Sequence, residues 1–165
     1  MSDIIQFKNL KRVLEDYGKN LVENYQRALA DYGKNASGDL SKSVKYVIGD
    51  DKNGVFEVNL ELLEYWKYIE NGRKAGKMPP ISAIEKWIEV KPVLPRPNKN
   101  GKLPTTKQLA YLIARKIGNE GILPRPILQE RIEYSNDVFF RLIEEAIAED
   151  LGTAMEIIFK EVGLS

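Results

Sequence analysis

The sequence predicts an α+β protein: long N-terminal and C-terminal helices bracket a β-hairpin-based antiparallel sheet and three shorter helices. Three observations support this. Apolar residues recur at three- and four-residue steps near both ends, they alternate with polar residues around an Asn-Gly pair, and prolines and glycines divide the middle into short segments. At 165 residues, with 43% hydrophobic and 30% charged residues, we expect one folded domain over residues 1–165.

The first helix is predicted over residues 4–34 and should end between Gly33 and Gly38. Its apolar positions form one stripe, namely Leu10, Leu14, Tyr17, Leu21, Tyr25, Leu29 and Tyr32. A β-hairpin is predicted over residues 40–60, because β-branched and aromatic residues alternate on both sides of Asn53-Gly54.

The middle of the chain is predicted to hold two short helices. An aromatic helix over residues 62–71 should end at Gly72 in a left-handed cap, followed by a mobile basic loop over residues 73–77. A second helix should start with a proline of the Pro79-Pro80 pair at its first position. Its apolar face would place Trp87 in the core with Ile81, Ile84 and Ile88.

A proline-rich arm is predicted at about 92–104, too rich in proline for a helix or a central strand. Thr105 and Gln108 then make a capping box for a helix that Gly118 and Gly121 end. The apolar face of that helix would be Leu109, Leu112, Ile113 and Ile117.

The last third of the chain is predicted to be dominated by one acidic helix. After an extended turn at residues 124–126, residues 127–134 fit either a strand or a helix. Ser135 or Asn136 would cap a C-terminal acidic helix at about 136–162.

Composition excludes much chemistry. The chain has no cysteine and no histidine, which removes thiol nucleophiles, imidazole bases and the usual zinc ligands. It also lacks phosphate-binding glycine-rich loops and a Gly-x-Ser-x-Gly elbow. We therefore expect no enzymatic activity, no catalytic residues, no metal and no cofactor. No apolar run spans a bilayer and no signal sequence is recognised, so we expect the protein to remain in the compartment where it is made.

Charge is segregated along the chain. Residues 91–125 carry eight basic side chains against one acid, and residues 129–165 carry nine acids against three basic side chains. The basic segment is compatible with a solvated surface, a nucleic-acid contact or a docking strip for another subunit, and we favour the docking strip. Prolines argue against a DNA-recognition helix there.

Candidate interface residues follow from these patterns. Three aromatic residues on one short helix cannot all point inward, so at least one should meet solvent or a partner. The candidates are these aromatic residues and basic residues from three loops: Tyr65, Trp66, Tyr68, Arg73, Lys74, Arg96, Lys99, Lys102 and Arg125.

The order of short motifs resembles a known family. Tyr-Trp-Lys-Tyr-Ile-Glu-Asn-Gly (65–72), Met-Pro-Pro-Ile (78–81), Leu-Ala (109–110) and Leu-Pro-Arg-Pro-Ile-Leu (123–128) follow one another as in the tail-completion or head–tail joining proteins of tailed bacteriophages, a group that includes minor tail protein Z. The chain departs from that pattern in having Ile127 in place of an aromatic residue, an insertion around residues 95–103, and a long acidic tail.

The resemblance implies a structural virion protein, made in the bacterial host cytoplasm and located at the head–tail junction, or neck. Its expected partners are further copies of itself in a homo-oligomeric ring and neighbouring portal, adaptor or tail proteins. Non-specific contact with packaged DNA stays open, and no membrane is involved. The alternative is a small nucleic-acid-binding or host-interacting regulatory phage protein that uses the basic strip at 91–125.

Overall fold

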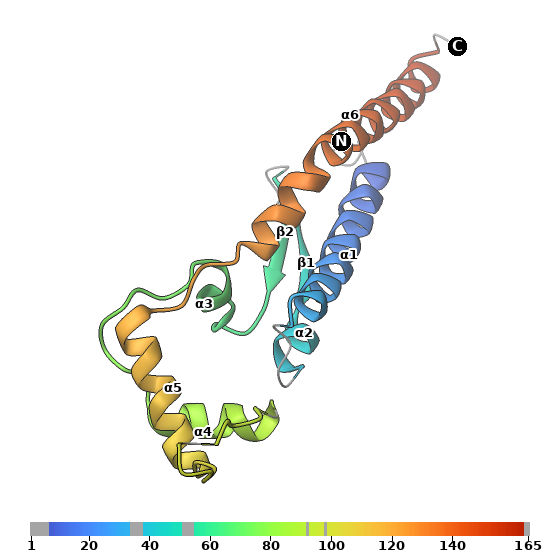
Figure 1. Ribbon diagram of the computed structural model, residues 1–165. Helices are drawn as coiled ribbons and strands as arrows, with labels where there is room; N and C mark the ends of the chain where they lie inside the picture. The colour runs from blue at the N-terminus through green and yellow to red at the C-terminus, as the bar shows by residue number, and fades with distance from the viewer. Residues whose placement is uncertain (1–6, 34–37, 51–54, 92, 98, 164–165) are drawn as a thin grey trace. The chain divides into compact units, whose positions relative to one another are not determined.

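The computed structural model describes residues 7–33, 38–50, 55–91, 93–97 and 99–163 (Figure 1). It confirms the α+β class with long helices at both ends. The elements in chain order are α1 (Lys8–Asp31), α2 (Asp39–Ser43), β1 (Lys45–Asp50), β2 (Phe56–Glu61), α3 (Trp66–Glu70), α4 (Ile81–Val90), α5 (Thr106–Glu120) and α6 (Ile127–Glu161). The short α2 was not expected from the sequence.

The chain divides into two compact units, and each is built from separate segments. Unit 1 contains Met1–Gln26, Val44–Glu61 and Gln129–Ser165, and unit 2 contains Arg27–Ser43 and Leu62–Leu128. The prediction of a single domain stays a prediction. The units are described separately below.

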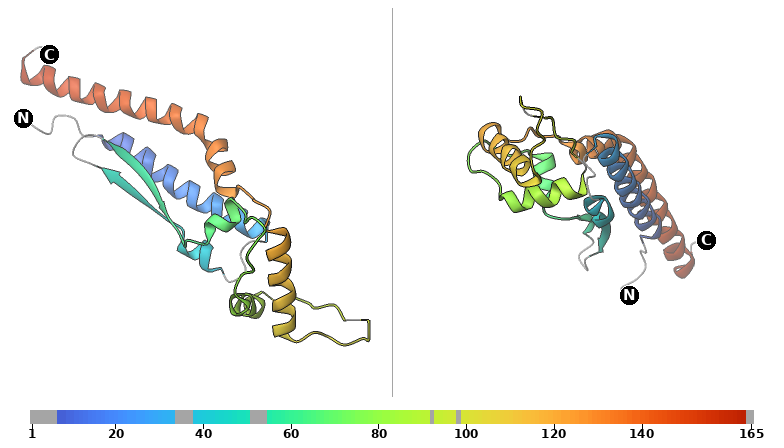
Figure 2. Two further views of the ribbon diagram at one scale, coloured as in Figure 1. Left: turned by 90° about the vertical axis from the view of Figure 1, so that its left-hand side faces the viewer. Right: turned by 60° about the horizontal axis from the view of Figure 1, so that its bottom comes forward.

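Unit 1 is built on α1 and α6, which run antiparallel beside each other (Figure 2). Near the start of α6 the ring of Tyr17 stacks on Phe139, with ring centroids 3.7 Å apart. Farther along α6, the carboxylate of Asp150 accepts hydrogen bonds from the backbone amides of Asn9 and Leu10, each 3.0 Å long. Since contacts move toward the N-terminus of α1 as α6 proceeds, the two helices point in opposite directions.

The predicted hairpin is confirmed by an antiparallel β1–β2 pair in which Ile48 lies opposite Val58. Along β2, half-buried and exposed residues alternate, as expected when one face of a sheet packs on a helix. The hairpin approaches α1 closely at Gly18, where an added Cβ would lie 2.5 Å from the Tyr46 ring. The predicted turn residues 51–54 lie outside the described residues.

Unit 2 contains α4 packed against α5 (Figure 2). The capping box is confirmed: Thr105 Oγ1 accepts from the Gln108 amide, and the Gln108 side chain accepts from the Thr105 amide. The face of α5 was predicted wrongly in part. Its fully buried residues are Ala110, Ala114 and Gly118, while Leu112 is 46% exposed.

Gly118 lies inside α5 rather than at its end, which corrects the prediction that it stops the helix. A Cβ there would meet Met78 Cγ at 2.8 Å, so the absent side chain allows the 73–78 loop to pack on the helix. Gly121, with φ of 76°, is the residue that ends α5. Small residues therefore let backbone approach backbone on this face.

Helix α4 differs from prediction in two details. Pro80 occupies the N-cap and not the first helical position. Trp87 is 40% exposed, and none of the ten residues of α4, all of them described, is fully buried. The expectation that Trp87 belongs to the core is therefore wrong.

The final helix begins earlier than predicted. It runs unbroken over 35 residues from Ile127 to Glu161, which settles residues 127–134 as helix. Ser135 does not cap it. Its hydroxyl instead donates back to the carbonyl oxygens of Arg131 and Ile132, both at 3.0 Å, as serines inside helices do.

Candidate assembly surfaces

Two of the four motifs that carry the family resemblance, 65–72 and 123–128, meet in unit 2. Arg73 and Ile122 exchange backbone hydrogen bonds of 2.9 and 2.8 Å in an antiparallel bridge. The amide of Arg125 donates to the carbonyl of Ile69 at 2.8 Å. The Tyr65–Gly72 motif is therefore fastened to the Leu123–Leu128 motif by main-chain bonds, and we call residues 69–73 and 122–128 the junction.

Glu70 completes the junction. Its side chain is 6% exposed, and both carboxylate oxygens accept from the backbone amide of Leu128, at 3.0 and 3.1 Å. Leu128 is the second residue of α6, whose amide has no partner within the helix. Glu70 thus caps α6 from another element and places a negative charge at the positive end of the helix dipole.

Gly72 and Gly121 are required by the junction. Both have positive φ, 67° and 76°. A Cβ on Gly72 would lie 2.3 Å from the Ile122 oxygen, and one on Gly121 would lie 2.2 Å from the Arg73 oxygen. Any side chain at either position would force the two segments apart.

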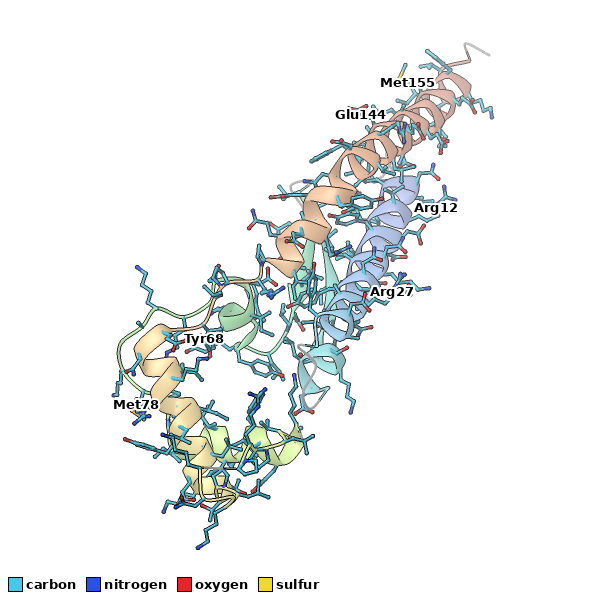
Figure 3. All side chains as sticks on the ribbon, in the orientation of Figure 1. Arg12, Arg27, Tyr68, Met78, Glu144 and Met155 are labelled. Atoms are coloured by element: carbon cyan, nitrogen blue, oxygen red, sulfur yellow. The ribbon has the colours of Figure 1, made fainter. Side chains whose placement is uncertain are left out.

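The aromatic candidates lie around α3. Tyr65 and Tyr68 are exposed, at 41% and 57%, while Trp66 is half-buried. The expectation that the three cannot all point inward is confirmed. In Figure 3 Tyr68 projects from α3.

The basic loop after Gly72 is held more firmly than predicted. Besides the main-chain bridge at Arg73, the Gly76 amide donates to the Gly118 carbonyl at 2.7 Å. The Arg73 side chain is directed inward along the loop, where Nη2 donates to the Lys77 carbonyl at 2.6 Å. Of these two candidates, Lys74 is the one whose side chain is exposed.

Three basic side chains gather at a hollow between the proline-rich arm and the first two turns of α5. Arg96 and Lys102 come from the arm, and Lys107 comes from α5. Apolar and aromatic surface from Leu103, Tyr111 and Leu112 lines the same space, which measures about 960 Å³. We call this the basic hollow. All six residues belong to unit 2.

The remaining basic candidates lie apart from the hollow lining. Lys99 is exposed in a turn of the arm. Arg125 is exposed at the junction, with its guanidinium carbon 5.7 Å from the centre of the Tyr32 ring. The structure thus brings Arg96 and Lys102 together and leaves Lys74, Lys99 and Arg125 at separate places.

An apolar surface on α6 was missed by the sequence analysis. Between Phe140 and the residue that follows α6, five large apolar side chains share an arc of about 100° at the ideal helical twist. They are between 43% and 63% exposed and comprise Phe140, Leu151, Met155, Phe159 and Val162. We call them the outer stripe. In Figure 3 Met155 and Glu144 project away from α1.

Acidic residues border the outer stripe. At the same helical twist Glu145, Glu149 and Glu156 fall along one edge of it, and all three are exposed. We call them the acidic row. The inner side of α6 is different, since Ala146, Asp150 and Ala154 are fully buried there. The signal for two faces was present in the sequence, because apolar residues of this helix fall on more sides than one core contact requires.

Metal sites and buried charges both depend on how the acidic side chains of the described residues are arranged. Within them, no three acidic side chains are grouped as metal ligands. The buried charged residues in the same ranges are Glu70 and Asp150, and each accepts hydrogen bonds from the first turn of a helix. Across the described stretches, no helix combines the length and apolar character needed to cross a membrane.

Comparison with known proteins gives no match among protein-family models, curated proteins or solved structures.

Proposed function

We propose that this protein is a structural virion subunit of a tailed bacteriophage, forming an oligomeric ring at the head–tail interface that completes the tail or connects it to the DNA-filled capsid. The observation that carries the proposal is the outer stripe on α6. Leu151, Met155, Phe159 and Val162 follow one another along this stripe, on a helix that packs α1 with its other face, and they indicate a surface that another protein covers.

The junction supports the family part of the proposal. Within the 65–72 and 123–128 motifs, Ile69 and Arg125 share a main-chain hydrogen bond, Glu70 supplies the buried carboxylate cap and Gly72 has a positive φ. These motif residues therefore contribute directly to the local structure. If two proteins share these motifs in the same order, the junction gives a structural reason for it. The resemblance then rests on more than proline-containing loop sequences.

The test is the mass of the purified protein by native mass spectrometry at increasing concentration, together with its detection in purified particles. We expect a closed oligomer of one stoichiometry and a virion component in fixed copy number. Because the surfaces involved are charged, raising ionic strength should shift the oligomer toward subunits. A monomer at every concentration and salt, and absence from particles, would refute the proposal.

A second candidate, a nucleic-acid-binding protein, is favoured by the basic hollow, where Arg96, Lys102 and Lys107 lie beside Tyr111. Three phosphate contacts would give a slope of about −3 for log affinity against log salt on duplex DNA. Fluorescence anisotropy with a labelled duplex separates the two candidates. Such a slope from a monomeric protein would favour DNA binding over the ring.

A further inference from the structure

We infer that the basic hollow of one copy receives the C-terminal half of α6 from a neighbouring copy, with the outer stripe on the hollow's apolar lining and the acidic row against its basic side chains. This inference rests on the proposed ring and names the contact that would build it. Such a contact joins two different surfaces, so it can repeat around a closed ring.

The size of the hollow fits two turns of a helix. An α-helix has a diameter of about 10–12 Å and rises about 5.4 Å per turn, so two turns fill roughly 850–1,200 Å³. The hollow measures about 960 Å³. Its volume therefore lies within the range for two turns of helix and exceeds what one side chain requires.

The chemistry of the two surfaces is complementary. The hollow offers Leu103 and Leu112 as apolar contacts, with Arg96 and Lys107 beside them. The outer stripe offers aliphatic and aromatic side chains with carboxylates along one edge. An amphipathic helix that lays its apolar face in a groove is a common way for proteins to bind one another.

The spacing along α6 matches this arrangement. Glu149 and Glu156 are seven residues apart, so they project from the same side about 10.5 Å from each other. Met155 lies between the two levels and is 48% exposed. One segment of two turns thus presents both carboxylates and an apolar side chain together.

Other occupants fit less well. Packing α6 against α6 of a second copy would bring two acidic segments together, each with nine acids against three basic residues over 129–165. Like charges in contact oppose association. A nucleic acid would satisfy the basic side chains but would leave Leu103 and Leu112 against a charged backbone.

Charge reversal on each surface tests the contact in the full-length protein. The first variant carries Arg96→Glu and Lys107→Glu, and the second carries Glu149→Lys and Glu156→Lys. We expect each variant alone to be monomeric at concentrations where the wild type assembles, because the dissociation constant of the contact between subunits should rise on the order of 100-fold relative to the wild type. A 1:1 mixture should assemble again, because each reversed surface then meets its reversed counterpart.

The matched control carries Lys74→Glu and Lys99→Glu, which make the same charge change on exposed residues outside the hollow lining. It should assemble like the wild type. Circular dichroism and thermal unfolding of each variant check the fold. If charge reversal disturbs the fold, the milder double variant Arg96→Ala with Lys107→Ala replaces it. This variant should also weaken assembly.

The outcomes separate this inference from the ring itself. A wild-type oligomer together with a hollow variant that assembles normally would overturn the contact and leave the ring standing. If the first variant assembles alone, while the second does not assemble and mixing does not restore it, the contact is α6–α6 packing instead. A wild-type protein that is monomeric throughout would overturn both the ring and the contact.

Discussion

Removing the carboxylate of Glu70 should destabilise the protein through α6. The side chain is 6% exposed and both oxygens lie within 3.1 Å of the Leu128 amide. A hydrogen bond to a charged group contributes about 1.5–3 kcal/mol, and an orphaned buried amide costs about 1–3 kcal/mol. Because these terms overlap, we expect Glu70→Ala to lower the free energy of unfolding by about 2–4 kcal/mol.

Glu70→Gln should lower the free energy of unfolding by a smaller amount, about 1–2 kcal/mol, because the glutamine side chain keeps one neutral acceptor for the Leu128 amide. The remaining cost comes from the lost charge at the positive end of the helix dipole. Urea unfolding followed by circular dichroism measures both variants. Hydrogen exchange gives a local readout, because the Leu128 amide should exchange faster in both.

Glu64→Ala is the matched control. Glu64 lies two residues before α3, and its carboxylate forms a 3.5 Å ion pair with Lys67 in which the Glu64 side chain is 90% exposed. An exposed pair of this kind contributes about 0.5 kcal/mol or less. Equal stabilities of Glu64→Ala and Glu70→Ala, with unchanged exchange at Leu128, would refute the capping role.

Three further predictions concern single positions. Asp150→Ala should lower the free energy of unfolding in urea by about 2–4 kcal/mol, because the first amides of α1 lose their acceptor. The control Glu149→Ala, on the exposed side of α6, should change it by no more than about 0.5 kcal/mol, and equal effects would contradict the capping role of Asp150. Gly72→Ala should destabilise the folded protein by about 2 kcal/mol or more, because the φ of Gly72 is 67° and a Cβ would clash with backbone atoms. Gly152→Ala, in open space within α6, should stabilise the protein by about 0.5–1 kcal/mol, and thermal unfolding that ranks the two variants the other way would refute the strain argument. Tyr68→Ala should leave monomer stability within about 0.5 kcal/mol but weaken assembly by about 2 kcal/mol if the 57% exposed ring anchors a partner, and unchanged native mass spectra would remove it from the interface.

Local signals in the sequence predicted the elements well. The helical stripe, the alternation around an Asn-Gly pair and the Thr105–Gln108 capping box each involve residues a few positions apart, and the structure contains all three elements. Gly72 was predicted as a left-handed cap for the same reason, and its φ is 67°.

What the sequence did not show depends on distant partners. Ser135 has the chemistry of a cap, but α6 already begins at Ile127 because Glu70, 58 residues before Leu128, supplies the acceptor. Likewise Asp150 caps α1 across 141 residues. Side chains that meet across such separations leave no periodic pattern to read.

The candidate interface was predicted only in part. Arg96 and Lys102 were named, but Lys107 and the apolar lining join them only when the arm folds over α5. The outer stripe was not predicted, because helical spacing shows that residues share a face and does not show which face meets the rest of the chain.

The separation between Asp150 and Asn9 bears on when the protein becomes competent to assemble. At about 5–20 residues per second, a ribosome needs roughly 7–28 s to add the 141 residues between the two. Through that interval α1 waits without its partner, while every segment of unit 2 has been synthesised once Leu128 is added. The outer stripe follows every segment of unit 2 in the chain, so a growing chain cannot offer it to a neighbour before the residues of unit 2 have been made. Synthesis order alone therefore makes the basic hollow available before the helix face that we infer it receives.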